Sequence, residues 1–122
     1  MGRKTKILVI DDEKKLCNLF KEVLTKEGYT VYSAFDGEKG LKELKAKKPE
    51  VILLDIKMPK LGGIQVLKKI RKTNEEVIII MITAYGTIGL AKKAMELGAY
   101  DFITKPFDFK FVKGLIKESL GE

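Results

Sequence analysis

Short apolar runs alternate along the chain with longer stretches in which apolar residues recur every three or four positions. The short runs are rich in β-branched residues and predict strands at residues 6–10, 30–34, 51–55, 77–83 and 101–105. The longer stretches predict helices, because this spacing places apolar side chains on one face of a helix. Five strand–helix repeats imply parallel strands joined by right-handed crossovers.

Glycine and proline mark the limits of several predicted helices. Asp36-Gly37 predicts a turn, Pro49 stops the second helix, and Gly62-Gly63 precede the third. The last two helices are predicted over residues 87–97 and 109–120. The first helix ends at Gly28, and its apolar stripe is predicted to consist of Leu16, Leu19, Phe20, Val23 and Leu24.

Acidic and phosphate-handling side chains lie at the carboxyl ends of four predicted strands, namely Asp11 and Asp12, Asp55, Thr83 and Lys105. In an open parallel sheet, ligands bind in the crevice outside these ends, so residues remote in sequence converge there. Neighbouring carboxylates repel one another by about 1 to 4 kcal/mol per pair, and a hard divalent cation with oxygen ligands relieves this repulsion. The pattern therefore predicts a Mg²⁺ site beside a carboxylate that accepts a phosphoryl group.

The composition is that of one globular domain, which we expect to span residues 1–122. The chain is 45% apolar and 34% charged, long enough to bury a sheet on both faces. Apolar runs are too short to span a bilayer and the N-terminus has no secretory pattern, so we expect a cytoplasmic protein that does not bind membranes. The chain ends directly after the last predicted helix, and no output domain is expected.

The chain contains one cysteine and no histidine. A disulfide framework and a cysteine-based metal site are therefore excluded, and Cys17 is expected to fill an apolar helix face. Imidazole catalysis is excluded as well, and any phosphohistidine donor must belong to another protein. The formal net charge of +7 comes from lysines that are interleaved with glutamates on every predicted helix. Such dispersed charge favours solvated helix faces over direct nucleic-acid binding.

Four blocks of sequence resemble one family in the right order: IDDE at 10–13, LLDIKMP at 53–59, ITAYGT at 82–87 and GAYDFITKPFD at 98–108. Over essentially its whole length the chain resembles a response-regulator receiver domain of the CheY-like type. It is most similar to stand-alone phosphorelay receivers and to the receivers of enhancer-binding regulators. The resemblance implies a flavodoxin-like α/β fold, a five-stranded parallel sheet of order 2-1-3-4-5 with helices on both faces.

The resemblance also implies a role for each site residue. Asp55 matches the phosphoacceptor, Asp11 and Asp12 the acidic pair around Mg²⁺, and Lys105 the ammonium beside the phosphoryl group. The backbone carbonyl of Lys57 matches a further metal ligand. Thr83 matches the hydroxyl that turns toward the phosphoryl group, Phe102 matches the switch aromatic, and the Lys105–Pro106 bond is expected to be cis. Gly62 departs from the pattern, because the family usually has an aspartate before Gly63.

These roles predict a two-component response regulator whose Asp55 takes a phosphoryl group from the phosphohistidine of a sensor histidine kinase. Phosphoryl transfer needs mainly positioning and charge neutralisation, which a metal ion, an ammonium and a hydroxyl supply. We expect no enzyme activity beyond the chain's own phosphorylation and autodephosphorylation. The product passes its signal, or the phosphoryl group itself, to a downstream protein.

Three other functions are consistent with parts of the pattern. A pseudo-receiver that works without phosphate is disfavoured by the intact set of site residues. An aspartyl-phosphate hydrolase of the haloacid dehalogenase type needs a second aspartate two residues after the nucleophile, where this chain has Lys57. A flavodoxin-like electron carrier needs a phosphate-cradling loop after the first strand, and IDDEKK is too acidic for that.

Two surfaces are predicted to meet partners. Leu16, Cys17 and Phe20 widen the apolar stripe of the first helix and are predicted to dock the kinase, while the chain itself is expected to be a monomer. The output is predicted to be a population shift of the fourth helix and fifth strand, since Gly86 and Gly89 lower helix stability there.

Overall fold

The computed structural model describes residues 4–84 and 86–122 and has parallel strands in the order β2-β1-β3-β4-β5. This confirms the predicted topology. The strands are β1 (Lys6–Ile10), β2 (Thr30–Ala34), β3 (Val51–Asp55), β4 (Ile78–Thr83) and β5 (Asp101–Thr104). The helices are α1 (Lys14–Lys26), α2 (Gly37–Lys47), α3 (Gly63–Thr73), α4 (Ile88–Glu96) and α5 (Phe109–Ser119).

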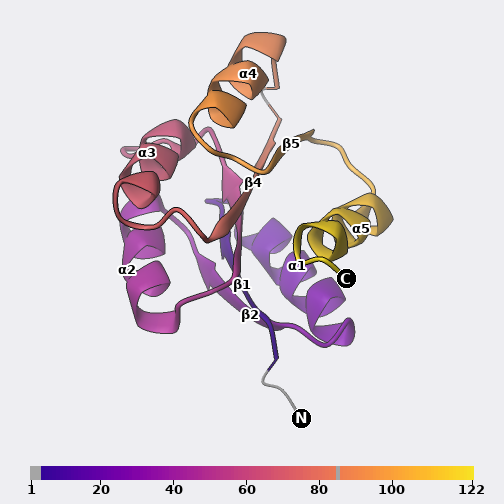
Figure 1. The fold of residues 1–122 in the computed structure, drawn as a ribbon. Coiled ribbons are helices and arrows are strands. Elements are labelled where there is room, and N and C mark those ends of the chain that lie inside the picture. The colour runs from indigo at the N-terminus through magenta and orange to yellow at the C-terminus, as the bar shows by residue number, and fades with distance from the viewer. Residues whose placement is uncertain (1–3, 85) are drawn as a thin grey trace.

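Helices cover both faces of the sheet (Figure 1). One core layer lies under α1 and α5 and contains Phe20, Leu24, Val112 and Ile116 against alternate residues of the strands. The other lies under α2, α3 and α4 and contains Val66, Leu67, Ile70 and Ala94. Every residue of β3 is buried, as expected for a central parallel strand whose two faces both meet helices.

The residues predicted to end or begin elements lie at or next to the observed boundaries. Asp36-Gly37 is not a free turn, because Asp36 caps α2 by accepting a hydrogen bond of 2.8 Å from the Lys39 N–H. Gly28 has φ of 96° just after α1, the left-handed conformation expected of a glycine that closes a helix. Lys105 lies one residue beyond β5, and the Lys105–Pro106 bond is cis.

The predicted stripe of α1 is wrong in one position. Leu19 is 47% exposed, whereas Cys17 is fully buried beside Phe20 and Leu24. The helix is therefore rotated so that Cys17 faces the sheet. Its thiol donates a hydrogen bond of 3.3 Å to the Asp11 carbonyl, which explains why this small side chain, and not Leu19, lies innermost.

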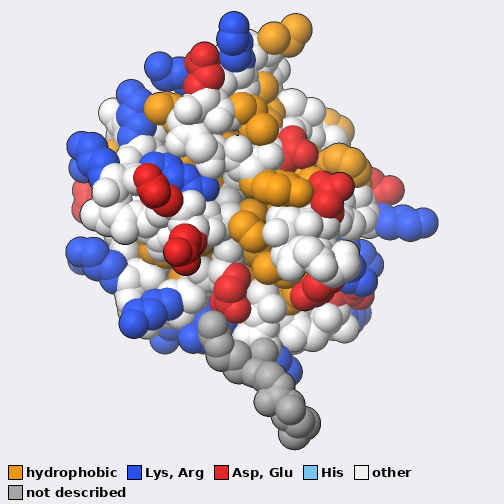
Figure 2. All heavy atoms as spheres, in the orientation of Figure 1, with side chains coloured by type: hydrophobic (Ala, Val, Ile, Leu, Met, Phe, Trp, Pro, Cys, Tyr) orange, Lys and Arg blue, Asp and Glu red, His pale blue; other side chains and the backbone are white. Residues whose placement is uncertain are grey.

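Charged side chains are dispersed over the surface. In Figure 2, Lys and Arg side chains crowd the α2 and α3 side of the molecule and are interspersed with acidic ones. Hydrophobic side chains are visible nearer the middle of the same face. No helix among the described residues has the length and hydropathy required to cross a membrane.

Candidate phosphoacceptor and metal site

Three carboxylates meet at the carboxyl edge of the sheet, as the sequence predicts. Asp11 and Asp12 follow β1, Asp55 ends β3, and each offers one oxygen within 4.8 Å of the other two. Asp11 is 3% exposed and Asp55 is 6% exposed, whereas Asp12 faces solvent. The neighbouring cavity has a volume of about 480 Å³, and Asp12, Asp55, Lys57 and Lys105 are among its lining residues.

Backbone contacts fix the two loops that present these carboxylates. Asp11 donates its N–H to the Ala34 carbonyl (3.1 Å), and its Oδ1 accepts from the Glu13 N–H (2.9 Å). After β3 the chain turns so closely that a Cβ at Gly63 would collide with the Asp55 carbonyl. Only glycine allows this approach, which holds the start of α3 against the end of β3.

Lys105 brings positive charge to the acidic cluster. Its Nζ lies 3.1 Å from Asp11 Oδ2, 3.0 Å from Glu13 Oε1 and 3.9 Å from Asp55 Oδ2. Burial opposes the charged form of this lysine, but hydrogen bonds with Glu13 and Asp11 outweigh it and raise the pKa of Lys105. The ammonium therefore stays charged beside Asp55 at neutral pH.

The carboxylates themselves bind protons more tightly than usual. Burial, followed by repulsion from Asp11, raises the pKa of Asp55 from 3.8 to about 6, although Lys105 and a hydrogen bond from the Lys57 backbone act in the opposite direction. Burial also raises the pKa of Asp11. The cluster holds more negative charge than Lys105 neutralises, a condition that favours cation binding.

The geometry and chemistry of the cluster fit Mg²⁺. The ion takes hard oxygen ligands at about 2.0–2.1 Å, so any two ligands of one ion lie at most about 4.2 Å apart. The three carboxylate oxygens lie within 4.8 Å of one another, so small side-chain movements would let all three hold one ion. Lys57, whose backbone carbonyl is predicted to be a further metal ligand, lines the same cavity.

The predicted switch residues lie on the two strands beside the site. Thr83 ends β4 with its side chain fully buried, and its carbonyl accepts from the Lys105 N–H at 2.8 Å. Phe102 is half-buried on β5 opposite Met81. A Cβ at Gly86 would lie 3.2 Å from the Phe102 ring and collide with Thr104, so the loop after β4 packs directly against β5.

Glu13 is a site residue that the sequence did not reveal. The sequence assigns no role to this residue of the IDDE block, yet its carboxylate, which is 62% exposed, forms the 3.0 Å ion pair with Lys105. Its position directly after Asp11 and Asp12 was the available signal, since a third acid in one loop adds to the same charge cluster. Glu13 holds the ammonium in an arrangement where Asp55 is its most distant partner.

Replacing Glu13 with glutamine should accelerate phosphoryl uptake from a small acyl phosphate by about fivefold. The carboxylate repels an incoming phosphoryl group and competes for Lys105, and a unit charge at about 4 Å in water contributes roughly 1 kcal/mol. Intact-mass measurement over time gives the rate. The control is Glu96→Gln, an exposed acid at the far end of α4. Uptake that is unchanged or slower in Glu13→Gln would contradict this role.

The structure contradicts part of the predicted docking surface. Cys17 is fully buried and Phe20 is 1% exposed, so neither side chain is available to a partner. Phe20 instead stacks on Phe107 at 5.5 Å and meets Phe109 edge-on at 5.2 Å. Leu16 is half-buried, and docking at this side chain stays a prediction.

Comparison with known proteins identifies a single family. The family model described as the response regulator receiver domain matches residues 7–117. The chain is similar to sporulation initiation phosphotransferase F of Bacillus subtilis (strain 168), with 36% identity over 115 residues that cover 94% of this chain and 93% of that protein. It is also similar to the alkaline phosphatase synthesis transcriptional regulatory protein PhoP of the same organism, with 41% identity over 94% of this chain.

The shared length differs between these relatives. The match covers 48% of PhoP, so the chain spans about half of that regulator. Among solved structures, the CheX–CheY–BeF₃–Mg²⁺ complex from Borrelia burgdorferi contains a chain with 30% identity and a TM-score of 0.91, covering 95% of this chain and 89% of that one.

Proposed function

Because this chain belongs to the response regulator receiver domain family of two-component systems, we propose that Asp55 accepts a phosphoryl group from the phosphohistidine of a sensor histidine kinase. The observation that carries the proposal is the position of Asp55. It ends the central buried strand within reach of two further carboxylates and within 3.9 Å of the Lys105 ammonium. The cavity beside it leaves one side of the carboxylate open to a donor.

The transfer needs no general base. An Asp55 oxygen attacks the phosphorus, the P–N bond to the donor imidazole breaks, and its electron pair returns to the imidazole nitrogen. Asp11, Asp12, Asp55 and the Lys57 carbonyl would hold Mg²⁺, which when bound neutralises charge on the phosphoryl oxygens. Lys105 leaves Glu13 to contact another of those oxygens. The resulting acyl phosphate is later lost to water or gives its phosphoryl group to a histidine of a second protein.

The relatives support this reading without extending it. One is named as a phosphotransferase and matches almost end to end, and the Borrelia complex contains BeF₃ and Mg²⁺. One proposed output is therefore that of a stand-alone relay, which passes the phosphoryl group to a second histidine-bearing protein. The other is that of a receiver within a longer regulator, which signals to the rest of that regulator. We propose a cytoplasmic monomer that meets its kinase near Leu16 and binds no nucleic acid directly.

Intact-mass spectrometry tests the function. Incubation with a small acyl phosphate and Mg²⁺ should add one phosphoryl group per chain. A chain that gains no phosphoryl group from either the small donor or a phosphorylated histidine kinase would instead be a phosphate-independent interaction module.

We propose that the phosphoryl group shifts the population of α4 and β5. Hydrogen bonds from Thr83 and Lys105 to its oxygens are worth about 1.5 to 3 kcal/mol each, and inverting a 1:99 equilibrium takes about 5.5 kcal/mol. Movement of Thr83 would pull the following loop, which packs on Phe102 at Gly86. The turned Phe102 ring then alters the surface of α4, β5 and α5.

Amide hydrogen exchange with and without beryllofluoride should therefore change mainly in α4 and β5. The mimic occupies the phosphoryl position, so the difference reports the switch alone. Phe102→Leu, which keeps an apolar side chain without the ring, should reduce the change while leaving Asp55 phosphorylation intact. Exchange differences confined to α1 would rule out the proposed output.

A further inference from the structure

A second hollow lies at the amino ends of β3 and β4, whereas Asp55 lies at the carboxyl end of β3. It is a groove of about 940 Å³ bordered by α2, α3 and the end of α5, about twice the volume of the cavity beside Asp55. Its volume falls in the range of about 300–1,000 Å³ found for small-molecule sites. Glu50 lines the groove directly before β3 and Asp55 ends β3, so the five residues of this strand separate the two sites by about 16 Å.

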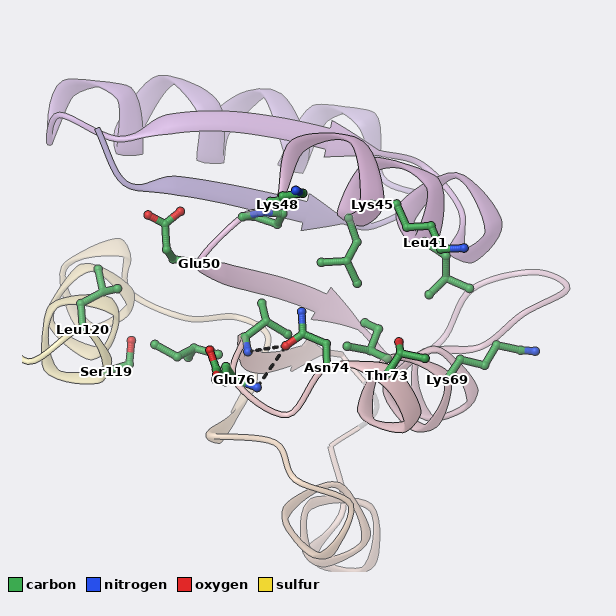
Figure 3. Close-up of a pocket in the computed structure, with 15 residues that line it drawn as sticks. Leu41, Lys45, Lys48, Glu50, Lys69, Thr73, Asn74, Glu76, Ser119 and Leu120 are labelled. Carbon is green, nitrogen blue, oxygen red and sulfur yellow. Dashed lines mark hydrogen bonds between the residues drawn. The ribbon is translucent and has the colours of Figure 1, made fainter. Parts of the chain in front are cut away.

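The floor of the groove is apolar. Leu44, Ile70 and Val77 line it from α2, α3 and the start of β4, and Ile70 and Val77 are buried while Leu44 is half-buried. Leu41 and Leu120 extend the apolar lining toward its two ends (Figure 3). An apolar ligand chain placed here would leave water, which is the main source of affinity in such sites.

Asn74 presents a fixed hydrogen-bond donor to this groove. Its N–H donates to Ile70 (2.8 Å), its carbonyl accepts from Arg71 (3.1 Å), and its Oδ1 accepts from the N–H groups of Glu76 and Val77 at 3.0 Å each. These bonds set the orientation of the amide, and Nδ2 points away from the two donors into the groove (Figure 3). Among the described residues, Nδ2 has no hydrogen-bond partner.

Charge is distributed unevenly around the groove. Glu50 and Glu76 lie toward one end, whereas Lys45 and Lys69 lie toward the other, and Lys48 lies above the middle (Figure 3). The Glu50 carboxylate already accepts from the Lys6 N–H at 3.2 Å. Away from these two acids, the polar groups facing the groove are mainly donors, which matches a ligand that only accepts hydrogen bonds.

The type of donor selects the type of anion. The Arg71 guanidinium is already bound to the carbonyls of Gly98 and Asn74, so no bidentate fork for a phosphate faces the groove. One neutral amide, in a groove whose exposed lysines outnumber its glutamates three to two, suits a singly charged carboxylate. A peptide would also bring backbone N–H groups, and the apolar floor of Leu44, Ile70 and Val77 offers them no side-chain acceptor.

We propose that this groove binds a small amphiphilic monocarboxylate. The carboxylate accepts a hydrogen bond from Asn74 Nδ2 in a groove lined by three lysines and two glutamates, and its apolar chain lies on Leu44, Ile70 and Val77. The site is independent of phosphoryl transfer, because its residues lie at the other end of β3 and β4.

Methyl NMR of the whole chain tests the proposal, with decanoate below its micellar concentration as the probe. Decanoate should shift the methyl signals of Leu44, Ile70 and Val77 in a saturable manner. Decyltrimethylammonium, with the same chain length and the opposite charge, should bind at least tenfold more weakly. Equal binding of the two amphiphiles, or no saturable shift with decanoate, would overturn the proposal.

Asn74→Asp is the matched variant. It keeps an oxygen for the Glu76 and Val77 N–H groups, so the loop is preserved, but it replaces the donor with a second acceptor of like charge. Decanoate affinity should fall at least tenfold, while phosphorylation of Asp55 is unchanged. Native-like affinity in this folded variant would refute the site. So would shifts produced by a short acidic peptide but not by decanoate, which would assign the groove to a protein partner.

Asp55→Asn separates this proposal from the proposed function. Its decanoate affinity should equal that of the native chain, because Asp55 does not contact the groove. A chain that fails to take up phosphate but binds decanoate would therefore contradict only the receiver chemistry, and the reverse result would contradict only the groove.

Discussion

Replacing Asp55 with asparagine will abolish the phosphoryl adduct formed with a small acyl phosphate and Mg²⁺. Asparagine has nearly the same shape, so the fit at the end of β3 is kept, but its amide is not a nucleophile and it removes one of three clustered carboxylates. The loss should be complete within the detection limit of intact-mass spectrometry, because Asp55 is the buried carboxylate of the cluster that lines the open cavity, whereas Asp11 does not line it and Asp12 faces solvent.

The control for this experiment is Glu96→Gln, which removes an exposed carboxylate at the far end of α4 and should label as the native chain does. Denaturation curves for both variants verify that they fold. An adduct of one phosphoryl group on folded Asp55→Asn would move the acceptor to another residue and overturn the assignment. Peptide mapping of that adduct would then identify the residue.

The topology was predictable because local and global preferences agree. β3 reads as an uninterrupted apolar run, which only a strand covered on both faces explains, and the structure buries all five of its residues. The convergence of Asp11, Asp55 and Lys105 then follows from parallel strands alone, since their carboxyl ends share one edge. No side-chain detail was needed for that step.

Burial on α1 was only partly predictable from spacing. Phe20 and Leu24 are buried as predicted, but both Cys17 and Leu19 fit the spacing, and tertiary contacts bury Cys17 and leave Leu19 exposed. Phe20 meets Phe107 and Phe109 from a segment almost 90 residues away in the chain. The periodicity of one helix contains no information about that encounter.

Glu13 and the groove at Asn74 were missed for a related reason. The ion pair of Glu13 joins residues 92 positions apart, and the groove forms only where α2, α3 and the end of α5 surround the amino ends of β3 and β4. Neither leaves a motif, since glutamate just before a helix and asparagine after a helix are common without a ligand. Such features become visible only when distances and hydrogen-bond partners are known.

The acidic cluster should make the metal-free chain less stable as the pH rises from about 4 to about 6. Folding raises the pKa of Asp55 from 3.8 to about 6, mainly through burial, so the folded state binds its proton more tightly than the unfolded state does. That proton stabilises the fold at low pH, and the stabilisation is lost as the pH passes the folded pKa. The shift corresponds to at most about 3 kcal/mol.

Magnesium should reverse this loss at pH 7 and do so far less at pH 5. At pH 5 an Asp55 with a pKa of about 6 is mostly protonated, so the ion must displace a proton and its affinity falls about tenfold. At a concentration one hundred times its dissociation constant, the ion adds about 2.7 kcal/mol to the free energy of unfolding. Urea denaturation at both pH values, with and without Mg²⁺, measures each contribution.

Asp55→Asn isolates the carboxylate from every other group that titrates in this range. Without metal, the variant should be more stable than the native chain at pH 7, and the difference should shrink as the pH falls through 6 toward 3.8, below which Asp55 is protonated in the unfolded state as well as in the folded one. Mg²⁺ should stabilise the variant much less, because one of its three carboxylate ligands is gone. A variant that is less stable than the native chain at pH 7 without metal would mean that Lys105 already compensates the charge of Asp55. Repulsion among the carboxylates would then not destabilise the metal-free fold.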